Sequence, residues 1–161
     1  MSQAPGTMAA AAAGLDVRVV ATDVPTSAEE SAALQGIDAG HLLRTIVIRR
    51  GTDDYVFVLV PGGRQIDWKR LRTHLGQRRL SLPDADEARA ATGYERGAIT
   101  PFGATTAWPV VADATIRGLG TVAIGAGARG VNLHVEAGTM LEALHATEAD
   151  VTSPAAPRGD A

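Results

Sequence analysis

The unbroken apolar run at residues 55–60, Tyr-Val-Phe-Val-Leu-Val, is the feature that most constrains how this chain can fold. A short run that is apolar at every position is typical of a strand covered on both faces. Residues 42–50 precede it, are rich in β-branched side chains and predict a second strand. Residues 51–54, Gly-Thr-Asp-Asp, predict a hairpin turn between the two, and Pro61-Gly62-Gly63 ends the run. We therefore expect a hairpin whose second strand is buried.

Helices and strands follow one another along the rest of the chain without a strict β-α-β alternation. Further strands are expected at residues 17–21, 108–112, 121–124 and 131–135. A helix is expected after a capping box formed by Thr26 and Glu29 and ends at Gly36. Helices are also expected at 68–75 and 84–92, each followed by a glycine, and a last one includes residues 139–144. These elements predict an α+β fold, a single domain with a central mixed, mostly antiparallel sheet flanked by helices.

The length of 161 residues fits one ordinary domain, and a hydrophobic fraction of 45% can supply a sizeable core. Residues 1–13 are mostly Ala, Ser, Gln, Gly and Pro and predict a flexible leader. Residues 152–161 predict a disordered tail. The folded domain is therefore expected to span residues 14–151.

Composition argues against several classes of function. The chain has no cysteine, which excludes a disulfide, a thiolate metal site and a Cys nucleophile. Its four histidines are too far apart in sequence to suggest a metal site, and no serine lies in a G-x-S-x-G motif. The net charge of -3 is not typical of a general nucleic-acid binder, and no apolar run is long enough to cross a membrane. We expect a cytoplasmic protein with no metal or other cofactor and with no DNA or membrane partner.

A glycine-rich segment at residues 125–130 matches the G-x-G-x-x-G pattern. A dinucleotide-binding loop must open a helix, but the alternating residues 131–135 predict a strand instead. Two alternatives remain for this segment: a tight turn whose backbone N–H groups line a pocket, or a purely structural turn.

Two further segments are candidates for a site. The rigid loop at residues 97–103 contains glycines and Pro101 and can offer backbone N–H donors to a carbonyl oxygen, although a structural connector fits it equally well. Arg44 precedes the apolar residues of a predicted strand and is expected at the mouth of the sheet. The alternative for Arg44 is an exposed residue at a strand end.

Several segments, in this order, resemble the YbaK/ProX-type family of aminoacyl-tRNA deacylases, which includes the editing domain inserted in bacterial prolyl-tRNA synthetases. They are residues 26–30 (TSAEE), 43–47 (LRTIV), 55–62 (YVFVLVPG), 91–97 (ATGYERG), 100–103 (TPFG), 109–113 (PVVAD) and 124–127 (IGAG). The ordered set covers residues 15–151, and the Gly97-x-x-x-Pro101 loop followed by the Gly125-x-Gly127 turn is its most specific part.

The resemblance implies a cleft that takes the 3′ aminoacyl-adenosine of a tRNA and hydrolysis of the ester that joins a wrong amino acid to it. It implies catalytic roles for Arg44, Gly97 and Gly125. Substrate-binding roles are implied for a larger set: Thr45, Thr100, Pro101, Phe102, Gly103, Ala126 and Gly127. Arg44 stands where the family has a characteristic Lys, and a guanidinium could still hold a phosphate in bidentate fashion.

An aminoacyl ester is already activated, so a positioned water, backbone donors and the ribose hydroxyl could suffice for its hydrolysis. The first hypothesis is thus a trans-editing aminoacyl-tRNA deacylase that supports translation fidelity. The alternative is a non-catalytic module that kept the fold and binds tRNA or an aminoacyl-tRNA synthetase. In both, the expected partner is the aminoacyl-tRNA 3′ end, and a synthetase is a further candidate partner.

Overall fold

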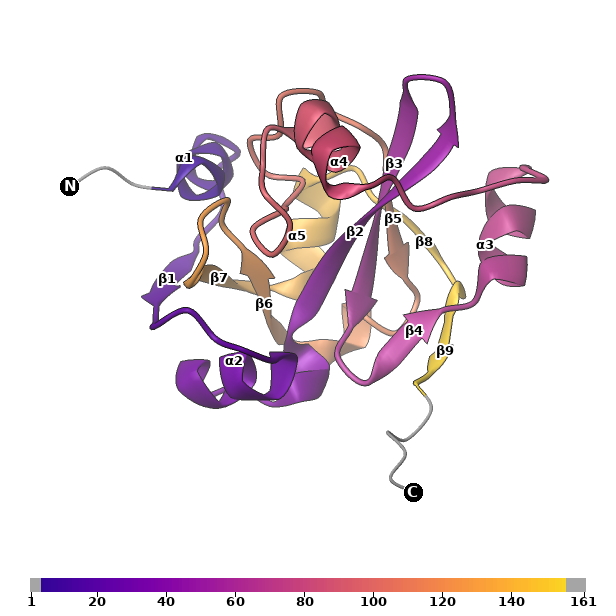
Figure 1. The fold of residues 1–161 in the computed structure, drawn as a ribbon. Helices are drawn as coiled ribbons and strands as arrows, with labels where there is room; N and C mark the ends of the chain where they lie inside the picture. The colour runs from indigo at the N-terminus through magenta and orange to yellow at the C-terminus, as the bar shows by residue number, and fades with distance from the viewer. Residues whose placement is uncertain (1–3, 156–161) are drawn as a thin grey trace.

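The computed structural model describes residues 4–155, in which nine strands fall into three sheets (Figure 1). The largest has the order β2-β3-β5-β8, with β2 Leu43–Gly51, β3 Asp54–Pro61, β5 Val110–Asp113 and β8 Thr147–Ala149. The second has the order β1-β7-β6, with β1 Arg18–Ala21, β7 Val131–Glu136 and β6 Thr121–Gly125. The third pairs β4 Arg64–Ile66 with β9 Thr152–Pro154.

Strand β3 lies at the centre of the core, as its apolar run predicts. It pairs with β2 in antiparallel fashion on one side and with β5 in parallel on the other. Its side chains alternate between two hydrophobic clusters: Phe57 and Leu59 belong to one, and Val56, Val58 and Val60 belong to the other. A strand that contributes to a core on both faces must be apolar at each position.

The α+β class is confirmed, and four of the six strand pairings are antiparallel. The strands form three sheets rather than one central sheet. The division arises because no ladder joins β2 to β6: the one isolated bridge between their sheets links Leu42, just before β2, to Ala123, so the first two sheets do not merge in the described chain.

Five α-helices surround the sheets: α1 Pro5–Ala12, α2 Ala28–Gln35, α3 Trp68–Leu75, α4 Ala85–Thr92 and α5 Ala137–Ala143. Short 3-10 turns lie at Ala39–His41 and Arg117–Leu119. The predicted ends of α3 and α4 are confirmed, because Asp67 and Asp84 cap their first turns and a left-handed glycine follows each helix.

The capping box of α2 lies one residue later than predicted. Ser27, not Thr26, is the N-cap, and its hydroxyl accepts a hydrogen bond from the Glu30 backbone N–H at 3.0 Å. Glu30, not Glu29, reaches back to accept from the Thr26 N–H at 2.9 Å. Two adjacent hydroxyl residues followed by two adjacent glutamates give the same motif in either register, and the packing of α2 selects one.

The chain ends differ from the sequence-based expectation. Helix α1 lies within the predicted leader 1–13, and its Ala10 is fully buried in the core. Gly6 donates its N–H to the Ala126 carbonyl at 2.7 Å, and a Cβ at Gly6 would lie 2.6 Å from that oxygen. Strand β9 begins the predicted tail, whose residues 156–161 lie outside the described part of the chain. Strands as short as β4, β8 and β9 are fixed by their pairing partners rather than by local pattern.

Asp113, at the end of β5, joins the central sheet to the C-terminal segment. Its buried carboxylate accepts hydrogen bonds from the backbone N–H groups of Thr115 and Val151, each at 3.1 Å. Burial alone would raise the pKa of this carboxyl, but the hydrogen bonds, chiefly from Thr115, hold the pKa below its ordinary value. The role of Asp113 is therefore structural.

We predict that Asp113→Asn lowers the free energy of unfolding at pH 7 by about 1–3 kcal/mol, because one amide cannot accept all of these hydrogen bonds. A depressed folded-state pKa gives a stabilisation that is present above the unfolded-state pKa and is lost as the pH falls through the folded value. The difference from wild type in urea unfolding should therefore shrink below about pH 4. Asp16→Asn, at an exposed position, is the control; equal stability of Asp113→Asn and wild type at pH 7 would contradict this role.

Candidate functional site

A cleft of about 710 Å³ occupies the gap between β2 and β6. One end of the gap is closed by the Leu42–Ala123 bridge, and the other end of β2 is covered where Arg49 pairs with Ser81. Figure 1 shows β2 at the front of the molecule, with α2 below it and α4 above it. The walls come from the segment that leads into α2, from residues 42–47 of β2, from residues 96–99 and from the turn between β6 and β7. Four segments far apart in sequence thus converge on one cleft.

The structure brings four of the predicted site residues together. Arg44 and Thr45 line the cleft from β2, Gly97 lines it from the loop after α4, and Gly125 lines it from the end of β6. The two glycine segments touch, because a Cβ at Gly125 would lie 3.4 Å from the Ile99 carbonyl oxygen.

The other predicted residues do not line the cleft. Three of them, Thr100, Phe102 and Ala126, are buried in the protein interior. Pro101 and Gly127 are half-buried and Gly103 is exposed. The family motifs therefore mark a structural unit whose members reach the cleft only in part.

Tyr94 explains two of these glycines. Its buried hydroxyl donates to the Phe102 carbonyl at 2.7 Å, and burial raises the pKa of the phenol. A Cβ at Gly103 would lie 2.8 Å from the Tyr94 hydroxyl, and a Cβ at Gly127 would lie 2.7 Å from its ring. Both glycines have a positive φ, which favours glycine as well. Gly103 and Gly127 therefore leave room for the Tyr94 side chain, whereas Gly125 has no such role.

Adjacent residues of β2 face opposite sides of the sheet. Thr45 pairs with Leu59 and therefore shares its face with the core cluster that contains Val47 and, at its edge, Ile99. Arg44 pairs with Val60 on the opposite face, and its guanidinium Nη2 donates to the Arg64 carbonyl at 2.6 Å. Thr45 thus faces the glycine loops, and Arg44 lies at the mouth of the cleft.

The cleft is electropositive. Its charged lining residues within the described chain are Arg44, Arg96 and Arg129, all exposed, and no Asp or Glu lines it. Arg129 also joins two walls, because its Nη2 donates to the Arg96 carbonyl at 3.1 Å and its Nε lies 3.8 Å from a Glu95 carboxylate oxygen. In a chain with a net charge of -3, this concentration of cations favours an anionic ligand.

Sequence reasoning missed Arg96 and Arg129. Each is the neighbour of a glycine in one of the two motifs that line the cleft, and this adjacency is the signal that could have identified them. The hydroxyl of Thr45 has no hydrogen-bond partner in the described part of the chain, although its oxygen is buried. A polar atom in this state is available to a ligand.

Two kinds of structural feature are absent from residues 4–155. No three His, Asp or Glu side chains come close enough there to hold a metal ion. Nor does any described helix have the length and apolar character needed to span a bilayer.

Comparison with known proteins gives a consistent result. The family model described as "Aminoacyl-tRNA editing domain" matches residues 22–142. The Enterococcus faecalis protein named "Putative Cys-tRNA(Pro)/Cys-tRNA(Cys) deacylase EbsC" is 25% identical over 127 residues, which cover 79% of this chain and 77% of that protein. A proline–tRNA ligase from Lactobacillus gasseri is 32% identical over 107 residues, 66% of this chain but only 19% of the ligase.

Two solved structures share the fold. One, described as "a putative trans-editing enzyme for prolyl tRNA synthetase", superposes with a TM-score of 0.83 at 23% identity and covers 94% of this chain and 99% of its own. The other, hypothetical protein APE2540, gives a TM-score of 0.84 at 24% identity and covers 91% of this chain and 98% of its own. At these identities the likeness concerns the fold alone.

Substitution of the two glycines in the Gly125-x-Gly127 turn should separate their roles. We predict that Gly127→Ala lowers the free energy of unfolding by at least about 1 kcal/mol, because its φ of 93° disfavours a side chain and Tyr94 blocks the Cβ. Gly125→Ala should have a free energy of unfolding close to that of wild type, because its Cβ would make only an ordinary van der Waals contact with Ile99. Equal destabilisation of both variants in urea would contradict this assignment.

Proposed function

The chain belongs to the aminoacyl-tRNA editing domain family, and from this premise we propose that it is a trans-editing deacylase, which hydrolyses the ester of a mischarged tRNA. The observation that carries the proposal is the convergence of Arg44, Thr45, Gly97 and Gly125 on one electropositive cleft. The three arginines suit the phosphates next to the 3′ end of a tRNA, and the volume of the cleft suits a small-molecule-sized group.

The chemistry proposed for this cleft needs no side-chain nucleophile. Among the cleft-lining hydroxyls, Ser27 caps α2 and Ser31 accepts a hydrogen bond from Gln35 at 2.9 Å. No His lines the cleft to activate either of them within the described chain. A water molecule would attack the ester carbonyl, and backbone N–H groups of the glycine segments would stabilise the oxyanion. The bond between the acyl carbon and the tRNA oxygen would break, and the neighbouring ribose hydroxyl would relay a proton from the attacking water to the departing oxygen.

Arg44 would act as a phosphate clamp at the mouth of the cleft. Its guanidinium gives one N–H to the Arg64 carbonyl and keeps further donors free for a phosphate. This role depends on positive charge at the mouth rather than on a group that reaches the ester. An Arg therefore serves where the family has a Lys.

Because charged tRNA is the substrate of translation, we propose a cytoplasmic site of action and a functional link to an aminoacyl-tRNA synthetase. The similarity to part of a proline–tRNA ligase supports prolyl-tRNA synthetase as the first candidate.

We predict that the purified protein releases the amino acid from at least one mischarged tRNA in a panel that includes Ala-, Ser- and Cys-tRNA pairs. Release is measured as loss of labelled aminoacyl-tRNA against a no-enzyme control at the same pH. Gly125→Val, which fills the cleft next to Ile99, should remove most of this activity without unfolding the protein. A wild-type protein that deacylates no member of the panel would refute the proposal.

Substitution of the cleft arginines should weaken tRNA binding in a salt-dependent way. Arg44→Ala, Arg96→Ala and Arg129→Ala should each raise KM and lower the slope of log K against log salt by about one, as expected for loss of one phosphate contact. Arg44→Lys should keep activity within a few-fold of wild type, because the charge remains.

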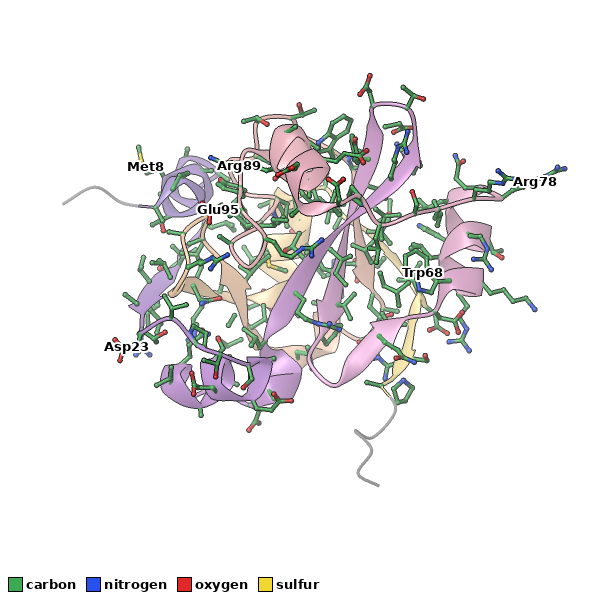
Figure 2. All side chains as sticks on the ribbon, viewed as in Figure 1. Met8, Asp23, Trp68, Arg78, Arg89 and Glu95 are labelled. Atoms are coloured by element: carbon green, nitrogen blue, oxygen red, sulfur yellow. The ribbon has the colours of Figure 1, made fainter. Side chains whose placement is uncertain are left out.

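Arg78→Ala is the matched control for these variants. Figure 2 shows Arg78 on the far side of the molecule from Glu95, which lies beside the cleft. Its loss should leave KM and the salt slope unchanged. An effect of Arg78→Ala equal to that of the cleft variants would place the tRNA elsewhere.

A further inference from the structure

Strand β2 has one paired edge and one edge that faces the cleft. The backbone of Arg49 shows which residues of β2 turn their N–H and C=O groups toward the cleft side. Its N–H donates to the Ser81 carbonyl at 2.8 Å, and its C=O accepts from the Ser81 N–H at 3.1 Å, so neither group bonds to β3. Phe57, which pairs with Val47, gives its N–H to Pro109 on the other side of β3, so the Val47–Phe57 pair exchanges no hydrogen bonds. Backbone groups alternate in direction along a strand. The N–H and C=O groups of Thr45 and Val47 therefore point away from β3.

No β-bridge joins Thr45 or Val47 to any strand other than β3 within residues 4–155. The bridges outside that ladder lie at Leu42 and Arg49, near its two ends. Thr45 and Val47 line the cleft, so their outward backbone groups are placed to meet a ligand there. An edge of this kind can accept one more extended segment.

Strand β6 presents a second sheet edge across the cleft. Ala126 gives its N–H to Val131 at 3.1 Å, so the preceding residue, Gly125, points its own backbone groups away from β7. The cleft is thus a slot between two sheet edges, formed by Thr45 and Val47 on one side and Gly125 on the other. The Leu42–Ala123 and Arg49–Ser81 bridges limit its length.

We propose that the aminoacyl group of the substrate fills this slot as a one-residue strand. An aminoacyl ester carries an ammonium donor and a carbonyl acceptor in the same order as the N–H and C=O of a residue in a sheet. The ester carbonyl would accept the Thr45 N–H, and the α-ammonium would donate to the Thr45 C=O, as in an antiparallel hydrogen-bonded pair. The inference rests on the proposed function and adds to it the backbone of Thr45 as the group that positions the ester.

The position of Arg44 selects the antiparallel orientation. In that orientation the ester end of the substrate points back along β2 toward Arg44, where the guanidinium can meet the tRNA phosphates. In a parallel orientation the ester would point toward Arg49, whose guanidinium lies 3.4 Å from the Glu87 carboxylate. The antiparallel arrangement therefore places the phosphates near the unpaired cation.

The dimensions and charge of the slot favour an aminoacyl group over a peptide. Only three outward-facing residues, Leu43, Thr45 and Val47, lie between the bridges at the ends of β2, which is too few to hold an added peptide strand firmly. The three cleft arginines favour an anionic ligand, whereas a general peptide has no fixed negative charges that match them. In an antiparallel pair of L-residues, the side chain of the bound amino acid lies on the face of Thr45, beside Ile99 and Gly125.

The first test removes one backbone donor. Thr45→Pro deletes an N–H that faces the cleft, and proline is tolerated at such positions of an edge strand. We expect a decrease in kcat of about 10²–10³-fold, as for loss of an oxyanion donor, with a Tm close to wild type. Val47→Pro deletes another outward N–H, which makes no bond to the ester; because Val47 is also buried in the core, kcat is compared per folded molecule as measured by circular dichroism, and on that basis Val47→Pro should lose far less activity. A larger loss in Val47→Pro than in Thr45→Pro would overturn the antiparallel arrangement.

The second test needs no substitution. Binding of 3′-(L-alanylamino)-3′-deoxyadenosine, a stable amide analogue, is followed by amide NMR of the wild-type protein. We expect the largest shift and a slowed hydrogen exchange at the Thr45 amide, with the Ile46 and Ile48 amides, which bond to β3, unchanged. An unmoved Thr45 amide at millimolar analogue would overturn the proposal, as would the same shift from tetra-alanine but not from the analogue.

The two proposals fail in different ways. If the wild-type protein deacylates mischarged tRNA and folded Thr45→Pro is equally active, the proposed binding mode in the slot is wrong and the proposed deacylase function is retained. If the analogue protects the Thr45 amide but no mischarged tRNA is hydrolysed, the slot stands and the deacylase is wrong.

Discussion

The pairing of β2 on one edge only is the constraint on which the rest of the site depends. Its ladder with β3 fixes the register of β2, and this register sends the Thr45 hydroxyl toward the glycine loops and Arg44 toward the mouth. It also turns the outward backbone groups of Thr45 and Val47 toward the cleft. A one-residue shift would exchange the two faces of the strand and destroy this arrangement. The buried β3 run prevents such a shift, because its side chains fill a core on both faces.

Glycine has two distinct uses within a few residues of the turn after β6. Gly127 has a positive φ and lies against the Tyr94 ring, so it serves the packing of the loop after α4. Gly125, at the end of β6 beside Ile99, has no side chain and therefore leaves space in the cleft. Tyr94 joins these uses, since its hydroxyl binds the Phe102 carbonyl and holds the loop that carries Gly97. A motif that looks uniform in sequence therefore contributes partly to the packing of a loop and partly to the lining of the cleft.

Local signals in the sequence predicted the elements whose causes are local. The Tyr55–Val60 run and the glycine helix ends act within a few residues, and the structure bears them out. Helix α1 and the short strands β4, β8 and β9 depend on distant partners, such as the Ala126 carbonyl that receives the Gly6 N–H, so local pattern could not reveal them. For the candidate site, resemblance named Arg44, Thr45, Gly97 and Gly125, which the structure places on one cleft. Only the three-dimensional structure could show that Thr100, Phe102 and Ala126 are buried. The same holds for the proximity of Arg96 to Arg129.

The central claim is that the aminoacyl end of a tRNA binds between β2 and β6, with its ester on the backbone of Thr45. A crystal structure of the protein with a short RNA hairpin that ends in a 3′-aminoacylamide tests it most directly. The account predicts an amide carbonyl oxygen within about 3 Å of the Thr45 nitrogen, the amino-acid side chain beside Gly125 and Ile99, and a phosphate on Arg44. A hairpin end bound outside this cleft, or one in the cleft with its carbonyl turned away from β2, would contradict it.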